Sequence, residues 1–309
     1  HTRYPLVTGV QTCALPISIR QSVSSEEHMI DRTAKLFIGG KQVRPDGNYS
    51  RVVLSAKGKR LGEVGEGNRK DIRNAVAAAR AAEGWTKATT HNRAQILYYI
   101  AENLSARASE FSNRIMQSTG VTPLFAKREV QMSIERLFTY GAYADKFEGA
   151  VHQPPLRGVA LAMKEAIGVA GVICPDEAPL LSFISLVAPL IAMGNRVVII
   201  PSERAPLVAT DFYQVLETSD VPAGVINIIT GSPLALAKTL ADHDDVDAIW
   251  AFGEKKLSTL VETSSAGNLK RTFVDDGYLT DWLEPHSAEG PAWLDHAVEI
   301  KNIWIPYGE

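Results

Sequence analysis

The pattern of apolar positions is clearest in the middle of the chain. It predicts two strands, Ile167–Cys174 and Arg196–Ile200, with an apolar helix at Leu180–Met193 between them. Strands that are apolar on both faces are typical of a parallel sheet covered on both sides, and a connection of this length makes a right-handed crossover. We therefore predict an α/β fold with a doubly wound parallel sheet. Ligands of such sheets bind beyond the carboxyl ends of the strands, here near Pro175 and Pro201.

The same periodicity predicts the elements on either side. Asn68 is a plausible N-cap for a first helix, whose apolar face includes Ile72 and Ala79. Predicted helices cover residues 68–84, 93–118, 122–147, 205–218, 234–242 and 257–264, and further buried strands cover 221–231, 246–252 and 269–274. A short strand that begins at Lys35 leads into a Gly-Gly turn, and another short strand is expected near Tyr49–Leu54.

The first residues do not have the pattern of a folded segment. Residues 1–18 lack an initiator Met and the regions of a secretory signal, and the stretch VQTCALPIS resembles translated sequencing-adapter sequence. We therefore interpret 1–34 as a non-native leader and linker, and expect the native chain to be the tail of a longer protein. Cys174 is then the one native thiol.

Composition limits the classes of function. The chain has 309 residues, 45% of them hydrophobic, and a net charge of −3, which suits one or two globular domains and argues against nucleic acid as a partner. Two cysteines exclude a disulfide scaffold, and no ligand spacing predicts a metal site. The longest apolar run, Leu180–Met193, is shorter than a membrane span and contains Pro189, so we expect no membrane partner and a cytoplasmic protein.

Several of these segments resemble the aldehyde dehydrogenase superfamily. The most specific match is Pro222–Gly231, which is similar to the family pattern PxGVxNxxTG, and Phe37-Ile38-Gly39-Gly40 resembles its first hairpin. The nucleotide-binding core shares Gly168, Cys174-Pro175, Pro179-Leu180, Pro189, Gly194-Asn195 and Pro201-Ser202-Glu203. The resemblance implies a Rossmann-like nucleotide-binding domain. It also implies vestigial cofactor-binding positions at Ile173, Pro175, Ser202, Glu203, Gly231 and Gly253.

The residues that carry the family's chemistry differ. Glu177 stands where the family has an oxyanion-stabilising Asn, and a carboxylate repels a developing negative charge. Ile200 replaces a cofactor-binding Lys, and Glu254 replaces a Ser that faces the dinucleotide phosphates at a helix N-terminus. Like charges about 4 Å apart repel by about 1–4 kcal/mol at effective dielectric constants of 80 to 20. Glu203 matches the carboxylate that binds the adenosine ribose, so weak nucleotide binding stays open.

Two further positions bear on catalysis. Asp275 lies near the position of the family's general base, although adjacent acids at a strand end more often form a turn or cap. No Cys follows Cys174, which aligns with a strand end and is better explained as a buried structural thiol. We therefore predict no catalytic residue, with Glu177 and Asp275 as degenerate positions, and no cofactor, or NAD(P) if there is one.

The last part of the chain suggests how the family's catalytic domain is replaced. Residues 149–166 predict a β-hairpin, and 298–306 alternate like the family's C-terminal strand, which joins an oligomerising sheet. The predicted domains are 35–148 with 167–278 for nucleotide binding, 149–166 with 298–309 for oligomerisation, and 279–297 as a linker in place of the catalytic domain. This arrangement resembles the degenerate second module of the two-module (sixteenth-family) aldehyde dehydrogenases.

Three hypotheses follow. The first is a non-catalytic module that partners an active aldehyde dehydrogenase module, either as a homo-oligomer or within one longer chain. The alternatives are an NAD(P)-dependent aldehyde oxidoreductase that uses Cys174 and Asp275, and a nucleotide-sensing module that uses Glu203.

Overall fold

A seven-stranded sheet forms the centre of the fold, with strand order β12-β11-β8-β9-β10-β2-β3. A computed structural model describes residues 33–155, 157–276 and 279–307, which belong to one structural unit. Five strands run parallel: β8 (Val169–Ile173), β9 (Arg196–Ile200), β10 (Ile226–Ile228), β11 (Ala248–Gly253) and β12 (Arg271–Asp276). The predicted α/β fold with a doubly wound sheet is confirmed.

The Gly-Gly turn near the start forms a hairpin that extends this sheet. It joins β2 (Leu36–Ile38) to β3 (Lys41–Val43), and β2 pairs antiparallel with β10. Gly39 and Gly40 have φ values of 61° and 74°, the left-handed conformation that two-residue hairpin turns require. A separate three-stranded sheet has the order β1-β5-β4. It consists of β1 (Thr33–Ala34), β4 (Ser50–Leu54) and β5 (Arg60–Gly65).

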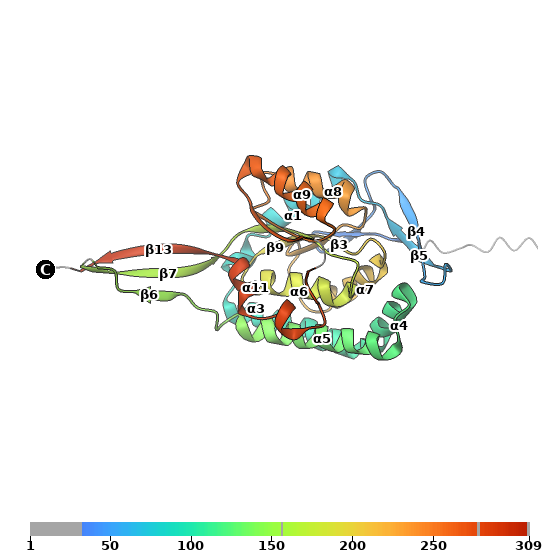
Figure 1. The fold of residues 1–309 in the computed structure, drawn as a ribbon, viewed down its shortest axis with the longest axis horizontal. Coiled ribbons are helices and arrows are strands. Elements are labelled where there is room, and N and C mark those ends of the chain that lie inside the picture. The colour runs from blue at the N-terminus through green and yellow to red at the C-terminus, as the bar shows by residue number, and fades with distance from the viewer. Residues whose placement is uncertain (1–32, 156, 277–278, 308–309) are drawn as a thin grey trace, which may run out of the picture. The chain divides into compact units, whose positions relative to one another are not determined.

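Helices cover both faces of the central sheet (Figure 1). One face carries α1 (Arg69–Ala81), α8 (Pro233–Asp242) and α9 (Lys255–Ser265). The other carries α6 (Pro179–Ala192) and α7 (Pro206–Glu217), beneath an outer layer of α3 (Thr90–Ala106), α4 (Ala108–Thr119) and α5 (Pro123–Tyr143), while a short α2 (Gly84–Lys87) follows α1. Every residue of α6 is buried, as its apolar sequence predicts, because it lies between the sheet and α5.

One predicted helix is wrong in its extent. Residues 93–118 form two helices, α3 and α4, which are separated at Arg107, where φ is −108° and ψ is 14°. The Arg107 side chain pairs with Glu110 and lies over the ring of Phe111, 5.6 Å from its centroid. No Pro or Gly marks the break in the sequence, so its cause is packing against the rest of the fold.

A third sheet, with three strands in the order β13-β7-β6, lies apart from the helices. It contains β6 (Ala150–His152), β7 (Gly158–Ala166) and β13 (Val298–Pro306). All three strands are antiparallel, and β13 pairs with β7 along its whole length, from Val298 opposite Ala166 to Pro306 opposite Gly158. Figure 1 shows the three strands extending side by side beyond the helices. We call this sheet the arm; its hairpin and final strand agree with the sequence prediction.

Buried hydrogen bonds hold the base of the arm. Gly194, with a left-handed φ of 91°, follows the end of α6. The side chain of the next residue, Asn195, is fully buried. Its Nδ2 donates to the carbonyls of Leu190 (3.0 Å) and Ala297 (2.7 Å), and its Oδ1 accepts from the Gly168 amide at 3.0 Å. One side chain therefore connects the end of α6, the start of β8 and the start of β13.

The segment between β12 and β13 is packed against the body of the fold. It contains α10 (Pro285–Ala288) and α11 (Pro291–His296). Trp282 and Trp293 are 4% and 6% exposed, and their rings lie 5.3 and 5.5 Å from that of Phe252 on β11. The sequence suggests a linker here, and the structure shows that this linker contributes to the core.

A buried arginine on α5 fixes this segment. Arg136 is 1% exposed; its guanidinium donates to the carbonyl of Trp282 at 2.6 Å and to the hydroxyl of Ser185 on α6. Its Nε lies 3.9 Å from the Glu289 carboxylate. The same cation therefore links α5, α6 and the segment that follows β12.

Candidate functional site

The carboxyl ends of β8, β9 and β11 meet at a small cavity of about 110 Å³. The cavity is lined by Cys174, Pro175, Asp176, Glu203, Pro233, Leu234, Phe252, Gly253, Glu254 and Leu257. This is the place where a doubly wound sheet binds its ligand. It brings together three of the predicted cofactor positions, Pro175, Glu203 and Gly253. We call this cavity the dinucleotide cleft.

The other three predicted positions do not line the dinucleotide cleft. Ile173 is completely buried within β8. Gly231 is buried before α8, where a Cβ atom would come within 2.8 Å of Leu236. Ser202 is 2% exposed, and its hydroxyl takes part in the turn after β9.

Asp176 organises that turn. Its Oδ1 accepts hydrogen bonds from the Ser202 hydroxyl (2.6 Å) and the Arg204 amide (3.1 Å), and its Oδ2 lies 3.4 Å from Arg204 Nε. The Ser202 hydroxyl in turn accepts from the Ala205 amide at 3.0 Å. Sequence reasoning did not identify Asp176 as a residue that binds this turn. Its carboxylate satisfies polar groups that a ligand could otherwise use.

The charge of the dinucleotide cleft is unfavourable for a dinucleotide. Three carboxylates line it, those of Asp176, Glu203 and Glu254, and its lining contains no Lys or Arg. Ile200, at the position of the family's Lys, is 0% exposed within the apolar core. Glu254 is the N-cap of α9, and its side chain accepts no hydrogen bond from the helix amides. A carboxylate at a helix N-terminus competes with a phosphate for the same positive potential.

The residues present therefore do not fit the pyrophosphate of a dinucleotide. Adding a pyrophosphate beside Glu254 would cost about 1–4 kcal/mol for each like-charge contact near 4 Å. Glu203 is the exception, because it lines the cavity and a carboxylate can accept a hydrogen bond from a ribose hydroxyl.

The N-terminus of α6 is capped from another helix. Ala178 is its N-cap, with a left-handed φ of 43° and no side-chain hydrogen bond. Glu129 on α5 supplies the acceptor: its carboxylate accepts from the amides of Leu180 at 2.9 Å and Leu181 at 3.3 Å. Glu129 is 1% exposed, and burial raises its pKa to about 7, although both amide hydrogen bonds act to lower it. Sequence reasoning missed this residue, since it lies in an ordinary helical stripe.

Glu177 lies just before this helix, beside a second cavity of about 390 Å³. The other lining residues are Phe125, Ala178 and the stretch 279–283 that follows β12. The pKa of Glu177 is raised, first by the loss of water around it and then by the like charges of Asp176 and Asp275. A group with this charge cannot donate to an oxyanion.

The two candidate catalytic groups do not converge. Cys174 is 3% exposed, its amide donates to the Ile200 carbonyl at 2.9 Å, and burial raises the pKa of its thiol well above the ordinary range. Asp275 is on β12, which is separated from β8 by β11. Its carboxylate accepts from the amides of Leu279 (2.8 Å) and Thr280 (2.9 Å), so it caps the next turn.

The described residues contain neither a metal-binding cluster nor a membrane-spanning helix. Across 33–155, 157–276 and 279–307, no group of three or more His, Cys, Asp or Glu side chains could hold a metal ion. None of the helices described there has the length and apolar character needed to cross a membrane.

Comparison with known proteins is consistent with this geometry. Residues 43–277 match the model of the aldehyde dehydrogenase family. Cytosolic 10-formyltetrahydrofolate dehydrogenase of Mus musculus is 32% identical over 254 residues, which are 79% of this chain and 28% of that protein. Aldehyde dehydrogenase 1 of Tanacetum cinerariifolium is 33% identical over 278 residues, which are 88% of this chain and 55% of that protein.

Solved structures show the same fold. Betaine aldehyde dehydrogenase from Staphylococcus aureus, in complex with NAD+, superposes with a TM-score of 0.76 at 24% identity, and the match covers 79% of this chain and 50% of that one. The chain thus spans about half of that structure and between 28% and 55% of the two relatives. With the family match extending over most of its length, the chain belongs to the aldehyde dehydrogenase family.

Proposed function

We propose that this chain is a non-catalytic aldehyde dehydrogenase-like module that assembles with an active aldehyde dehydrogenase module. The observation that carries the proposal is the dinucleotide cleft of about 110 Å³, lined by three carboxylates without a Lys or Arg. The family fold is retained, while Ile200 stands in place of a positive charge that would hold a dinucleotide and Glu254 adds a negative one. No cofactor is expected, and NAD(P) is the candidate if one binds.

The positions of the reactive groups support the same proposal. A nucleophilic thiol must be accessible and must ionise easily, and Cys174 is buried with a raised pKa. A general base must have a free carboxylate near the nucleophile. Asp275 lies on a different strand from the one that ends at Cys174, and its carboxylate already accepts hydrogen bonds from two backbone amides. Glu177 replaces a hydrogen-bond donor with an acceptor.

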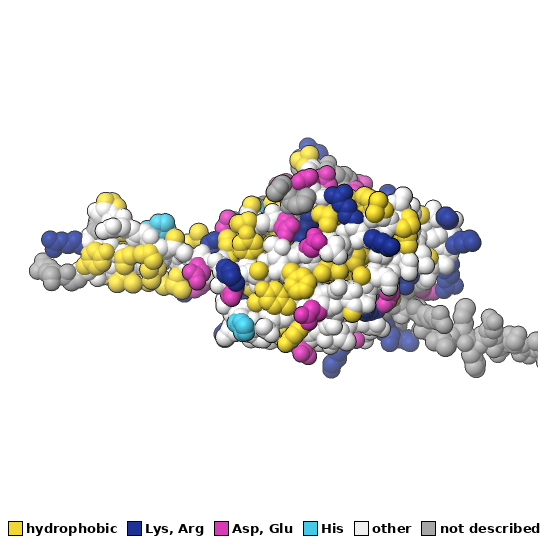
Figure 2. Space-filling view, turned by 90° about the horizontal axis from the view of Figure 1, so that it is seen from below, with side chains coloured by type: hydrophobic (Ala, Val, Ile, Leu, Met, Phe, Trp, Pro, Cys, Tyr) yellow, Lys and Arg dark blue, Asp and Glu magenta, His cyan; other side chains and the backbone are white. Residues whose placement is uncertain are grey.

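The arm supports assembly, because each of its faces carries exposed apolar side chains among its polar ones. In an antiparallel pair, directly opposed residues lie on the same face. Ile300 and Trp304, opposite Lys164 and Ala160, are 60% and 61% exposed on one face. The other face carries Val151, Val159, Leu161, Met163, Ile303 and Ile305. Figure 2 shows hydrophobic side chains along these strands.

A sheet that exposes apolar side chains on both faces and has a free strand edge favours burial against another protein. The proposed partner is a second copy of this chain or an aldehyde dehydrogenase module in the same longer protein. Nucleic acid and membranes are not proposed as partners. The proposed compartment is the cytoplasm, in keeping with the relative that is named cytosolic.

Oxidation of aldehydes tests the non-catalytic part of the proposal. The chain is expected to produce no NAD(P)H from an aldehyde and NAD(P), with no difference between the wild type and Cys174→Ala. Calorimetry is expected to show no saturable NAD+ binding. Turnover that is lost in Cys174→Ala would overturn the proposal and favour the oxidoreductase. Saturable NAD+ or ATP binding that weakens in Glu203→Ala would instead favour the nucleotide-sensing module, which the presence of Glu203 in the lining of the dinucleotide cleft supports.

Light scattering tests the assembly. Trp304→Glu places a charge on one apolar face of the arm, and it is expected to weaken self-association about tenfold or more because the charge must lose water at the interface. Leu124→Glu is the matched control, since Leu124 is 80% exposed on α5, away from the arm. Deletion of 298–305 should abolish the association. An oligomeric state that is unchanged by both arm variants would refute the assigned interface.

A further inference from the structure

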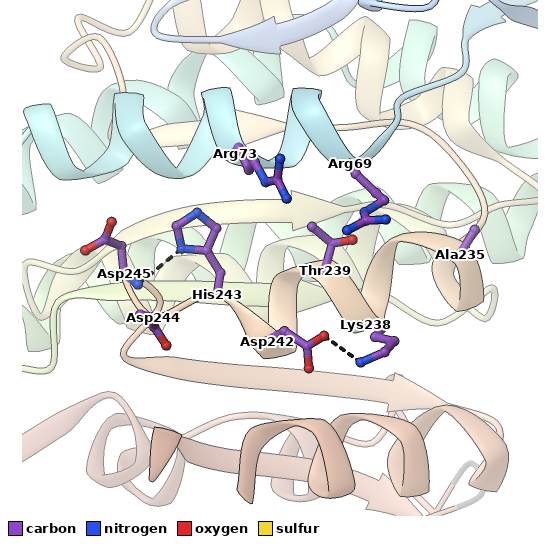
Figure 3. Close-up of a pocket in the computed structure, with 9 residues that line it drawn as sticks. All are labelled: Arg69, Arg73, Ala235, Lys238, Thr239, Asp242, His243, Asp244 and Asp245. Carbon is purple, nitrogen blue, oxygen red and sulfur yellow. Dashed lines mark hydrogen bonds and ion pairs between the residues drawn. The ribbon is translucent and has the colours of Figure 1, made fainter. Parts of the chain in front are cut away.

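A larger groove lies between α1 and α8, and it shares no lining residue with the dinucleotide cleft. Its cavity measures about 450 Å³, within the range of small-molecule sites. The lining residues are Arg69, Arg73, Ala235, Lys238, Thr239, Asp242, His243, Asp244 and Asp245, drawn in Figure 3. Ala235 and Thr239 lie one turn apart on α8, and Figure 3 shows the Thr239 side chain on the side of α8 that faces α1. We call this cavity the α1–α8 groove.

Two arginines supply unpaired positive charge to this groove. Arg69 and Arg73 lie one turn apart on α1, and Figure 3 shows both guanidinium groups directed from α1 toward α8. Within the described part of the chain, neither arginine side chain forms an ion pair or a hydrogen bond, whereas Lys238 pairs with Asp242 at 2.6 Å. The first-turn amides of Lys70 and Asp71 are already bonded to the Asn68 side chain. An anion here would therefore be bound by the arginine side chains.

Neutral donors face the arginines across the groove. The Thr239 hydroxyl lies on α8 between the two guanidinium groups in Figure 3. His243 Nδ1 accepts a hydrogen bond from the Asp245 amide at 3.1 Å, so the proton of the neutral ring is on Nε2, which can donate. Asp244 and Asp245 add carboxylate acceptors at the far end of the groove, where Asp245 Oδ1 also lies 3.9 Å from Arg80 Nε. The groove thus has donors for an anion at one end and acceptors for hydroxyl groups at the other.

We propose that the α1–α8 groove binds a small phosphate monoester that carries hydroxyl groups. Arg69 and Arg73 would hold the phosphate, with Thr239 donating to it, and Asp244 and Asp245 would accept from the hydroxyls. Two planar guanidinium groups match a dianion with three terminal oxygens better than they match a single carboxylate. This site does not depend on the dinucleotide cleft or on the proposed assembly.

Titration calorimetry of the full chain with glycerol phosphate tests the proposal. Saturable binding is expected for glycerol phosphate, weaker binding for glycerate, and none for glycerol. The double variant Arg69→Gln and Arg73→Gln should weaken binding about tenfold or more, because two charge-assisted contacts are lost. The matched control changes Lys127 and Arg128 to Gln, which removes two exposed positive charges from α5.

A second measurement locates the ligand. Burial lowers the pKa of His243 in the free protein, with Lys270 and Arg73 also lowering it and Asp244 and Asp245 raising it. A bound dianion is expected to raise this pKa in an NMR titration of the ring resonances. Absence of binding up to about 10 mM, equal binding by the double variant, or a loss of binding in Glu203→Ala with no change at His243 would each overturn the proposal.

Discussion

Replacing Glu129 with Gln should change how the stability of the protein depends on pH. The Glu129 carboxyl group is buried between α5 and the N-terminus of α6, and its pKa is raised from an ordinary 4.5 to about 7. The folded state therefore holds this proton more tightly than the unfolded state does. Below about pH 4.5 both states are protonated and the group costs no stability; as the pH rises toward 7 the cost grows, and above 7 it is complete.

The size of the change in stability follows from the shift in the Glu129 pKa. Moving a carboxyl pKa from 4.5 to about 7 lowers the free energy of unfolding by about 3 kcal/mol once both states are ionised. Gln keeps an oxygen that can accept from the Leu180 and Leu181 amides, and it does not ionise. Its buried NH₂ group adds a penalty of about 1–3 kcal/mol, but that penalty does not vary with pH. The pH dependence of the difference between variant and wild type is therefore the informative quantity.

Urea denaturation at about pH 5 and about pH 8 measures this difference by linear extrapolation. The stability of Glu129→Gln relative to wild type should increase by about 2–3 kcal/mol over that interval. Other groups that titrate in the range, such as His243 and His296, are common to both proteins and cancel. Glu135→Gln on the exposed side of the same helix is the control, and its stability relative to wild type should not change with pH. If the stability of Glu129→Gln relative to wild type also does not change with pH, burial of an ionised Glu129 carboxylate does not destabilise the fold and the reasoning is refuted.

Two further predictions concern packing. Trp293→Ala should lower the free energy of unfolding by about 3–5 kcal/mol in denaturant titrations, because a buried ring is removed. The control Leu279→Ala, at a side chain that is 78% exposed, should change it by about 0.5 kcal/mol or less. Similar small effects for both variants would show that the segment after β12 does not contribute to the core. The Cys174 thiol, buried with a raised pKa, should react with a thiol reagent only as fast as the chain unfolds. Rapid labelling of the native protein that is lost in the control variant Cys174→Ser would contradict the buried position of this thiol.

The sequence predicts the fold best where local signals determine it. The helix α6 has Pro179 in its first turn and Gly194 just after its end, and both are signals of the backbone itself. The break between α3 and α4 at Arg107 depends on contacts with α7, including the 3.5 Å approach of Arg107 Nη1 to the Asp211 carbonyl. Such a break is not visible in helical periodicity.

The sequence predicts the part of the candidate site that depends on strand order. The resemblance places Pro175, Glu203 and Gly253 at strand ends, and topology brings strand ends together. The functions of Asp176 and Glu129 depend on which distant amides and hydroxyls their carboxylates contact. Those contacts are made across 26 and 51 residues of sequence, so they depend on the completed fold.

The pairing of β7 with β13 has a consequence for biosynthesis. Residues 158–166 leave the ribosome long before 298–306 are made, and the two strands are far apart in sequence. Until then, the β6–β7 hairpin presents an unpaired edge and apolar side chains to every nearby nascent chain. Slow closure of so long a loop makes this hairpin the point where aggregation would start and where a chaperone would be needed most.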